Sequence, residues 1–386
     1  MKQFDFFMPM HLKFGEDIVN KIGTIASSYG DKALIIVDSK LKSTPQMDAL
    51  IDILDKSDCK AITFDGVITN ADTKTVALGV ELAKSSYSNV IIGFGGIRTM
   101  SIAKAIAMLA TNSGTIEDYI DGKTQEKDSL PYIELPSVPC DPLMFRDEFL
   151  ITDARKNLPY VITLKPGSTK YVIFDSNFIS SLPHRYIVST IVSLFSNSFD
   201  GYVSTKSSYF VDFMFLKAFE FFNKRISTLT EDNIPDKDTQ NDFYLSGLFA
   251  SIGLNVTSGG IISALSYVIN SKYKLPKSFI NAILLPYVME FVVPAVPDKF
   301  VKIYEALNGE KIEGGGSSSE IALKTIEMVR KILLSLKLPL KLSNFNLIKQ
   351  NELSHIADIA KKFEVINFTP RICTSDDLYD ILNKAY

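Results

Sequence analysis

The chain has 386 residues, of which 46% are hydrophobic and 22% are charged, and its formal net charge is −3 at pH 7. This composition is typical of a folded globular protein with two or three domains and excludes a disordered chain. No block of basic residues is present, so nothing in the charge pattern favours a nucleic-acid partner. The three histidines, His11, His184 and His355, lie too far apart for one helix or hairpin to bring two of them together. A metal site built from neighbouring histidines is therefore excluded.

The cysteines and the apolar segments indicate a cytoplasmic protein. Cys59, Cys140 and Cys373 show no C-x-x-C spacing, and we expect them to be reduced and mostly buried. The first ten residues lack the apolar stretch of a signal peptide. The longest apolar stretch, Phe279–Val296, contains two prolines, an asparagine and a glutamate, which favours a buried core helix over a membrane span. We expect no membrane partner.

The first 180 or so residues alternate between short apolar runs and helical periodicity. This alternation predicts βαβ units and a mostly parallel, Rossmann-like sheet. Ligands of such sheets bind at the carboxyl ends of the strands, where Asp38 and Gly93–Arg98 fall. The predicted strands are Ala33–Val37, Ala61–Phe64, Asn89–Ile92 and Tyr132–Leu135, and the predicted helices are Pro45–Lys56 and Thr73–Ser86.

After Pro183 the strand signals nearly vanish and helical periodicity takes over. We therefore predict two domains, an α/β domain over 1–183 and an all-helical domain over 184–386. Polar composition predicts loops at Thr228–Gln240 and Gly314–Glu320, and the second lacks the Gly-Lys-Ser/Thr of a phosphate-binding loop. The predicted helices are Tyr186–Ser204, Phe210–Arg225, Asp242–Ile252, Ser278–Val293, Ser319–Leu336 and Glu352–Phe363.

The order of these segments resembles the iron-containing (group III) alcohol dehydrogenases. The segment Asn281–Phe291, with the sequence Asn-Ala-Ile-Leu-Leu-Pro-Tyr-Val-Met-Glu-Phe, is the most specific match. The other matching segments are collinear over nearly the whole chain: Met8–Glu16, Ile92–Gly96 with Ala103–Ala107, Ile151–Asp153, Tyr171–Pro183, Tyr202–Ser204 and Thr369–Arg371.

The resemblance implies a dehydroquinate synthase-like fold whose two domains enclose a cleft. It also implies NAD(P) on the N-terminal side of that cleft and a divalent iron or zinc ion on the helical side. In the family the metal polarises the alcohol or carbonyl oxygen while the nicotinamide exchanges hydride. Family members often pair through their N-terminal domains, so the resemblance further implies a homodimer.

The metal positions that the resemblance implies are all changed in this chain. The family places an Asp and a His four residues apart before Tyr202-Val-Ser204, and these positions hold Ser193 and Asn197. The two remaining His positions, counted back from Asn281, hold Ser263 and Lys277, and a further His near the substrate is Tyr267. Ser and Asn are weak neutral ligands, and an ammonium group repels a cation. We therefore expect no bound metal.

The cofactor motifs are altered as well. The family's Gly-Gly-Gly-Ser turn is Gly95-Gly96-Ile97-Arg98 here, and the β-branched side chain of Ile97 obstructs a pyrophosphate. The family's Asp after this turn is Ser101, and the Lys after Ile-Thr-Asp is Pro159. The family's cofactor stretch Thr-Thr-Ala-Gly-Thr-Gly-Ser-Glu aligns with Ser137–Met144, which has lost two glycines, gained Pro139 and Pro142, and places Asp141 where phosphate or ribose would lie. The remaining cofactor-binding candidates are Asp38, Asn70, Gly95, Gly96, Arg98 and Ser137.

Several of these residues have a second interpretation. Asp38 either binds ribose hydroxyls, which would favour NAD over NADP, or caps the turn after its strand. Arg98 either binds a phosphate or is an ordinary surface arginine. Lys277 either places its charge in the former metal cavity as a catalytic electrophile or fills the space in an ion pair. Asp141, Asp147 and Asp200 are candidate replacement ligands, although no two of them have a ligand spacing.

Two functions follow from these observations. The first is a pseudoenzyme that has lost metal-dependent NAD(P)-linked alcohol and aldehyde oxidoreduction and serves as a binding or assembly partner. The second is a divergent, metal-independent NAD(P)-dependent oxidoreductase for a small alcohol or aldehyde. If NAD(H) binds, we expect weak binding, and a small molecule in the interdomain cleft is a third interpretation. Ile97, Pro139 and Pro142 discriminate among these functions, because a dinucleotide has to fit past them.

Overall fold

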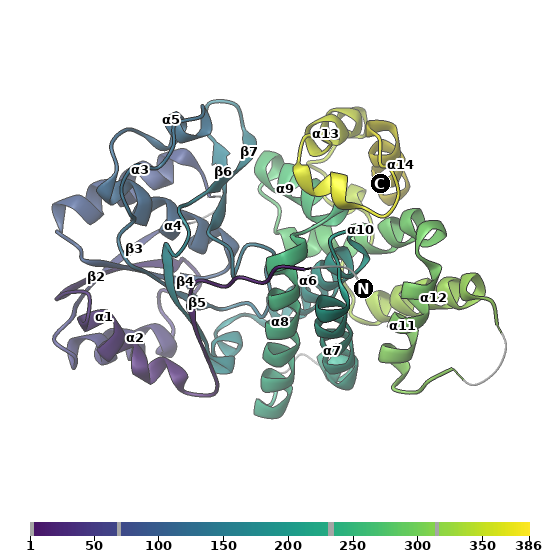
Figure 1. Cartoon of the computed structure of the whole chain (residues 1–386), viewed down its shortest axis with the longest axis horizontal. Helices are drawn as coiled ribbons and strands as arrows, with labels where there is room; N and C mark the ends of the chain where they lie inside the picture. Colours follow the sequence, from purple (N-terminus) through teal and green to yellow (C-terminus); the bar gives the residue numbers. More distant parts are fainter. Residues whose placement is uncertain (1–3, 68–70, 231–234, 313–315) are drawn as a thin grey trace. The chain divides into compact units, whose positions relative to one another are not determined.

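The computed structural model describes residues 4–67, 71–230, 235–312 and 316–386 (Figure 1). Two compact units divide the chain. The α/β unit contains Phe7–Val138 and Leu143–Pro183, and the helical unit contains the described residues of Met1–Phe6 together with Pro139–Pro142 and His184–Tyr386. The short segment Pro139–Pro142 thus belongs to the helical unit although 41 residues of the α/β unit follow it in the chain.

Six parallel strands form the sheet of the α/β unit, in the order β1-β8-β5-β4-β2-β3. Figure 1 shows α1 and α2 on one side of this sheet and α3, α4 and α5 on the other. Register is fixed by buried aliphatic residues, as in the pairing of Ile35 with Ile92. The strands are β1 (His11–Phe14), β2 (Lys32–Asp38), β3 (Lys60–Val67), β4 (Val90–Gly95), β5 (Tyr132–Pro136), β6 (Glu148–Asp153), β7 (Leu158–Thr163) and β8 (Thr169–Phe174). The helices are α1 (Ile22–Ser27), α2 (Pro45–Asp55), α3 (Thr73–Ser85), α4 (Ile97–Thr111) and α5 (Ile116–Ile120).

The predicted strands and helices of this unit are confirmed to within a few residues, because each is an apolar run or an amphipathic stretch bounded by polar residues. The antiparallel hairpin of β6 and β7 was not predicted. An isolated parallel β-bridge between Asp72 and Thr152 of β6 links this hairpin to the rest of the unit. A core of buried aliphatic side chains, including Leu34, Ile91 and Ile106, lies between α3, α4 and the sheet.

The helical unit contains nine α-helices in its described part. Three helices, α9, α11 and α14, were not predicted. The expected loop Thr228–Gln240 is wrong over its last four residues, since α8 begins at Lys237 with the Asp236 carboxylate accepting a hydrogen bond from Thr239 N at 2.7 Å. Residues 231–234 of this loop lie outside the described residues. The helices are α6 (His184–Val203), α7 (Tyr209–Ile226), α8 (Lys237–Thr257), α9 (Ile261–Tyr273), α10 (Lys277–Val292), α11 (Pro297–Asn308), α12 (Ser318–Ser335), α13 (Leu353–Ala360) and α14 (Ser375–Ala385).

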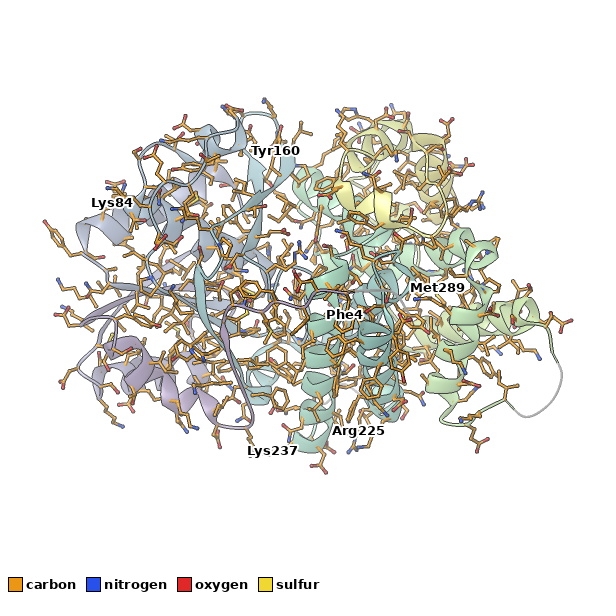
Figure 2. All side chains as sticks on the ribbon, in the orientation of Figure 1. Phe4, Lys84, Tyr160, Arg225, Lys237 and Met289 are labelled. Carbon is orange, nitrogen blue, oxygen red and sulfur yellow. The ribbon has the colours of Figure 1, made fainter. Side chains whose placement is uncertain are left out.

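Helix α7 carries aromatic side chains on both its inner and outer faces. Phe215 and Phe219 are fully buried, whereas Phe210 stacks on Phe4 of the N-terminal segment with ring centroids 5.1 Å apart. Figure 2 shows Phe4 over this part of the unit. The outer end of the helix is held by an ion pair of 2.6 Å between Arg225 and Asp242 of α8.

One stretch among the described residues, Lys277–Ala295, is long and apolar enough to cross a membrane, and 61% of its most apolar window is buried inside the protein. Helices α8 and α9 meet the same criterion only as a pair, which is bent by 95°. The stretch contains α10, which packs against α6, α9, α12 and α14. This packing agrees with the predicted core helix.

Candidate functional site

Two of the cofactor-binding candidates contact each other in the α/β unit. Asp38 ends β2 and Arg98 lies in the first turn of α4, and an Nη atom of Arg98 is 3.6 Å from a carboxylate oxygen of Asp38. The other carboxylate oxygen of Asp38 accepts a hydrogen bond from Lys40 N at 3.0 Å. Asp38 therefore caps its turn, as one of the two interpretations expected, and Arg98 is its ion-pair partner.

The glycine-rich turn between β4 and α4 keeps one sterically required glycine. A Cβ atom at Gly95 would lie 2.6 Å from Thr99 Oγ1, whereas one at Gly96 would meet no atom closer than 3.7 Å. The Thr99 hydroxyl is buried and has no hydrogen-bond partner among the described residues. Ser137 is buried, and its N–H donates to Gly95 O at 2.9 Å. The sixth candidate, Asn70, lies outside the described residues.

Helix α4 contains a buried ammonium group that sequence reasoning missed. Lys104 Nζ donates to the backbone oxygens of Leu143 and Arg146 at 2.9 Å and lies 3.5 Å from a carboxylate oxygen of Glu134 on β5. The Lys104 and Glu134 side chains are 2% and 0% exposed. A lysine inside the apolar run Ala103–Ala107 was the available signal, because such a lysine must find partners in the core.

In the helical unit, two of the four former ligand positions hydrogen-bond the same asparagine. Asn281 of α10 donates from Nδ2 to Ser193 Oγ at 2.8 Å and to Asn197 Oδ1 at 3.3 Å. The i, i+4 spacing of Ser193 and Asn197 on α6 places both on one helix face, as the resemblance implied. Asn281 Oδ1 is buried without a partner among the described residues.

The third former ligand position, Lys277, forms an ion pair. Its Nζ lies 3.4 Å from a carboxylate oxygen of Asp141 and 4.7 Å from the centre of the Tyr267 ring. The Lys277 and Asp141 side chains are 11% and 8% exposed. The ammonium group thus lies between a carboxylate and an aromatic face.

The segment Pro139–Pro142, which contains Asp141, packs closely within the helical unit. A Cβ atom at Gly247 of α8 would lie only 1.8 Å from Pro139 O, so the segment and α8 approach as closely as glycine allows. Burial raises the pKa of the Cys140 thiol to about 12, against the opposing effect of hydrogen bonds with Ser251 and Asn197. A raised pKa favours the protonated thiol at neutral pH, which is typical of a buried structural cysteine.

The fourth former ligand position, Ser263, is part of a helix cap. The buried Asp200 carboxylate accepts hydrogen bonds at 3.0 to 3.3 Å from the N–H groups of Gly260, Ile262 and Ser263 at the start of α9, and at 3.1 Å from Ser263 Oγ. Burial raises the pKa of Asp200 to about 6, and these hydrogen bonds oppose the shift. The sequence could not show this partnership, because α9 was not predicted.

The residues at these four positions do not fit a divalent cation. Ser193 and Asn197 are neutral, Ser263 is bonded to Asp200, and Lys277 carries a positive charge. No group of three or more His, Cys, Asp or Glu side chains among the described residues could hold a metal ion. The other candidate ligand, Asp147, accepts hydrogen bonds from Gly167 N at 2.6 Å and Thr169 N at 3.0 Å within the α/β unit.

The three histidines lie on separate elements, as the sequence required. His11 is in β1 and stacks on Tyr171, His184 begins α6, and His355 is in α13. The three cysteines are free and buried. In the described part of the helical unit, the four positions where the resemblance implies metal ligands thus hold hydrogen-bonded or ion-paired side chains.

Two family models together match nearly the whole chain. The iron-containing alcohol dehydrogenase model matches residues 9–179, and the Fe-containing alcohol dehydrogenase C-terminal model matches residues 187–386. The chain therefore belongs to the iron-containing alcohol dehydrogenase family.

Three of the curated relatives match over nearly their full length at low identity. Alcohol dehydrogenase 4 of Saccharomyces cerevisiae is 24% identical over 382 residues, covering 99% of this chain and 98% of that protein. The NAD-dependent methanol dehydrogenase of Bacillus methanolicus is 22% identical, with 99% of both chains covered. The 1,3-propanediol dehydrogenase of Citrobacter freundii is 21% identical, with 100% and 99% covered.

Solved structures confirm the fold. A 1,3-propanediol oxidoreductase superposes with a TM-score of 0.92 at 21% identity, and an alcohol dehydrogenase from Oenococcus oeni with a TM-score of 0.91 at 20% identity. Each comparison covers 100% of both chains. The α/β domain with a mostly parallel sheet and the helical second domain, predicted from sequence, are those of this family.

Proposed function

We propose that this chain is a pseudoenzyme of the iron-containing alcohol dehydrogenase family, in which metal-dependent NAD(P)-linked oxidoreduction has been lost. In this proposal the chain acts as a binding or assembly partner, as a cytoplasmic homodimer. Its relatives carry names of active alcohol oxidoreductases, so the proposal rests on residues in which this chain departs from the pattern that the family resemblance implies.

The observation that carries the proposal is the ion pair of Lys277 with Asp141. A divalent cation next to the Lys277 ammonium would be repelled by on the order of several kcal/mol at an effective dielectric constant near 20. The Asp141 carboxylate, which could otherwise attract a cation, is already ion-paired with the same ammonium group.

The second candidate is a metal-independent oxidoreductase in which Lys277 polarises a carbonyl. The low exposure of its ammonium group supports this alternative, since charges act more strongly away from water. The ion pair with Asp141 opposes it, because the charge is already compensated. The two candidates differ in one measurable quantity, which is turnover without metal.

The test combines metal analysis with a nucleotide titration. The purified chain is incubated without oxygen with Fe²⁺ or Zn²⁺, exchanged into metal-free buffer, and measured by mass spectrometry for metal content. The same sample is titrated with NADH, whose fluorescence is easily followed because the chain has no Trp. We expect well below one metal per chain and NADH binding weaker than about 1 mM, an affinity of about −4 kcal/mol.

One tightly bound metal per chain would overturn the proposal. Micromolar NADH binding, with hydride transfer to a small aldehyde and no metal, would instead establish the second candidate. Sedimentation velocity on the same preparation tests the proposed homodimer separately.

A further inference from the structure

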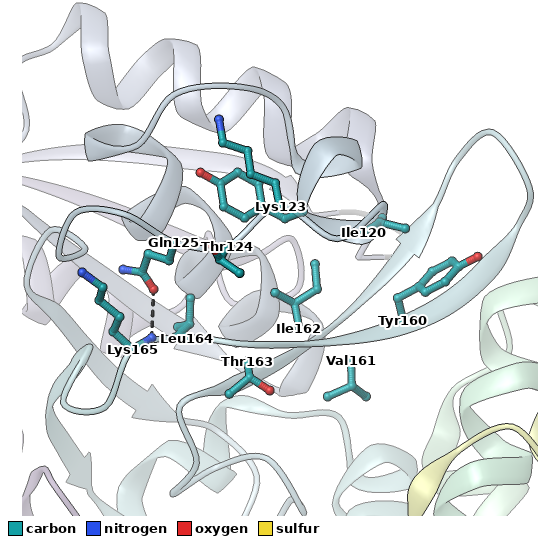
Figure 3. A pocket seen from close by; sticks show the side chains of 11 residues that line it. Ile120, Lys123, Thr124, Gln125, Tyr160, Val161, Ile162, Thr163, Leu164 and Lys165 are labelled. Carbon is teal, nitrogen blue, oxygen red and sulfur yellow. Dashed lines mark hydrogen bonds between the residues drawn. The ribbon is translucent and has the colours of Figure 1, made fainter.

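The α/β unit contains a pocket of about 360 Å³ that none of the residues above lines. It lies between strand β7 on one side and α5 with the segment Lys123–Gln125 on the other (Figure 3). We call it the β7 pocket. Its volume falls in the range of small-molecule sites, which is roughly 300 to 1,000 Å³.

The apolar part of the β7 pocket lies on one face of β7. Side chains alternate along a strand, and Figure 3 shows Ile162 and Leu164 pointing toward Lys123–Gln125 while Val161 and Thr163 point the other way. Pro159, at the position where the family resemblance implies a cofactor lysine, shares the face of Val161 and Thr163 by this alternation, and these two residues also line the pocket. Pro159 itself is not a lining residue.

The floor of the β7 pocket is apolar. Leu164 is 4% exposed, and Ile120 and Ile162 are partly buried against the core of the unit. The rings of Tyr119 and Tyr160 extend this surface. Such a floor favours an aliphatic chain over a sugar or a peptide backbone, whose polar groups would lose water without gaining partners.

The rim of the β7 pocket is positive. Lys123 and Lys165 line it, and no Asp or Glu is among the lining residues. Lys123 Nζ donates to Ser113 O and Ser113 Oγ at 2.8 and 3.0 Å, and Lys165 Nζ contacts Glu126 O. An ammonium group has three N–H donors, so each lysine keeps donor capacity for an anion.

Polar groups beside the lysines are already oriented. Gln125 Oε1 accepts a hydrogen bond from Lys165 N at 2.9 Å, and Gln125 Nε2 donates to Lys127 O at 2.8 Å, which fixes the wall of the pocket. Carboxylates lie near both lysines. Asp128 is 3.7 Å from Lys165 and 92% exposed, which makes it a weak competitor for an incoming anion. Asp118 lies beside Lys123, since a Cβ atom at Gly114 would be 2.5 Å from Asp118 Oδ2 and 3.1 Å from Lys123 Nζ.

We propose that the β7 pocket binds a short aliphatic carboxylate, with the chain on Ile120, Ile162 and Leu164 and the head group at the rim that Lys123 and Lys165 line. The proposal is independent of the proposed metal loss, because every residue it uses belongs to the α/β unit, whereas Ser193, Asn197, Ser263 and Lys277 belong to the helical unit. A ligand there would be an effector or a carried metabolite rather than a substrate of the family's hydride transfer.

The test follows the isoleucine and leucine methyl signals of the full chain by NMR during titration with four probes. Hexanoate carries both chain and charge, 1-hexanol only the chain, acetate only the charge, and hexylammonium the opposite charge. We expect saturable shifts at Ile120 and Ile162 with hexanoate, at least tenfold weaker binding of hexanol and acetate, and none of hexylammonium.

Lys123→Met and Lys165→Met should each weaken hexanoate binding about tenfold, a change of about 1.4 kcal/mol. Lys84→Met is the matched control, since Lys84 lies on α3 and does not line the pocket. Equal affinity for hexanol and hexanoate, shifts confined to other methyl groups, or unchanged binding in both variants would each overturn the proposal. None of these outcomes bears on metal content, so a failure here leaves the proposed function as it stands.

Discussion

The Lys277 ammonium group lies 3.4 Å from the Asp141 carboxylate, although the two residues are 136 positions apart in the chain. The pair connects the segment Pro139–Pro142 to the start of α10. It occupies one of the positions where the family resemblance implies a metal ligand. The Lys277 ammonium group thus lies at a position where the resemblance implies a histidine side chain.

The first prediction concerns the coupling of this pair. Lys277→Met leaves the Asp141 carboxylate buried without its counter-charge, and we expect a loss of about 2 to 4 kcal/mol in the free energy of unfolding. Asp141→Asn combined with Lys277→Met should lose less than the sum of the two single changes. Urea unfolding of the four proteins gives the coupling energy, for which we expect about 1 to 3 kcal/mol.

The exposed pair Lys217–Glu220 is the control for this cycle, because its side chains are 37% and 46% exposed. Its coupling should stay below about 0.5 kcal/mol. Additive losses for Lys277 and Asp141 would show that their proximity contributes nothing to stability.

A second prediction is that metal binding can be restored only if Lys277 is replaced. Ser193→Asp, Asn197→His, Ser263→His and Lys277→His together supply the Asp and three His that the resemblance implies. We expect this variant to bind one Zn²⁺ per chain. The same variant with Lys277 retained should bind at least roughly 100-fold more weakly, since it lacks one ligand and carries a repelling charge.

Zinc titration with a chromophoric chelator measures both affinities, and circular dichroism verifies that the variants are folded. Equal zinc affinity with and without Lys277 would contradict the role assigned to its charge.

A third prediction is a pH dependence of stability that originates at Asp200. Its carboxyl has a pKa of about 6 in the folded protein and an ordinary value of 3.8. Between these values the folded state binds more protons than the unfolded state, so stability falls as the pH rises from about 4 to 6. The total change is on the order of 3 kcal/mol at most, and it is complete above the folded pKa.

Asp200→Asn removes this titration while keeping the shape of the side chain. The free energy of unfolding of the wild-type protein minus that of the variant, measured from pH 4 to 7, should decrease as the pH rises. A difference that is constant with pH would mean that Asp200 titrates alike in both states.

A fourth prediction concerns Gly247 in the interior of α8. Gly→Ala in a helix ordinarily stabilises by about 1 kcal/mol. Here the new Cβ would overlap the backbone oxygen of Pro139, and we expect a net loss of about 1 to 3 kcal/mol. Gly316→Ala is the control, because its Cβ would meet nothing closer than 3.5 Å. Thermal unfolding of both variants tests this prediction. A stabilised Gly247→Ala protein would mean that the segment Pro139–Pro142 moves away from α8 without loss of stability.

The sequence alone predicts those elements whose hydrophobic pattern is contained in a short stretch of the chain. The runs that form β2 and β4 are apolar at every interior position, and their parallel pairing follows from the helices between them. Helix α9 escaped notice because nearly all of its residues are buried, so it has no polar face from which a period could be recognised.

The partners of the candidate residues could not be predicted, because they are distant in the chain. For Lys277 the sequence leaves two interpretations, a catalytic charge or an ion-paired lysine, and it does not name Asp141 as the partner that the structure shows. Asp38 and Arg98 were weighed separately, and only the fold places them side by side. In each case the sequence identified a chemical group but not the group that meets it.

Asn281 donates to both Ser193 and Asn197, so three neutral side chains from two helices hold one another by hydrogen bonds. Under the proposed function, this chain folds without taking up a metal ion. Its folded yield should be the same in iron- or zinc-depleted medium as in supplemented medium, and its abundance in a cell would not follow the supply of either metal.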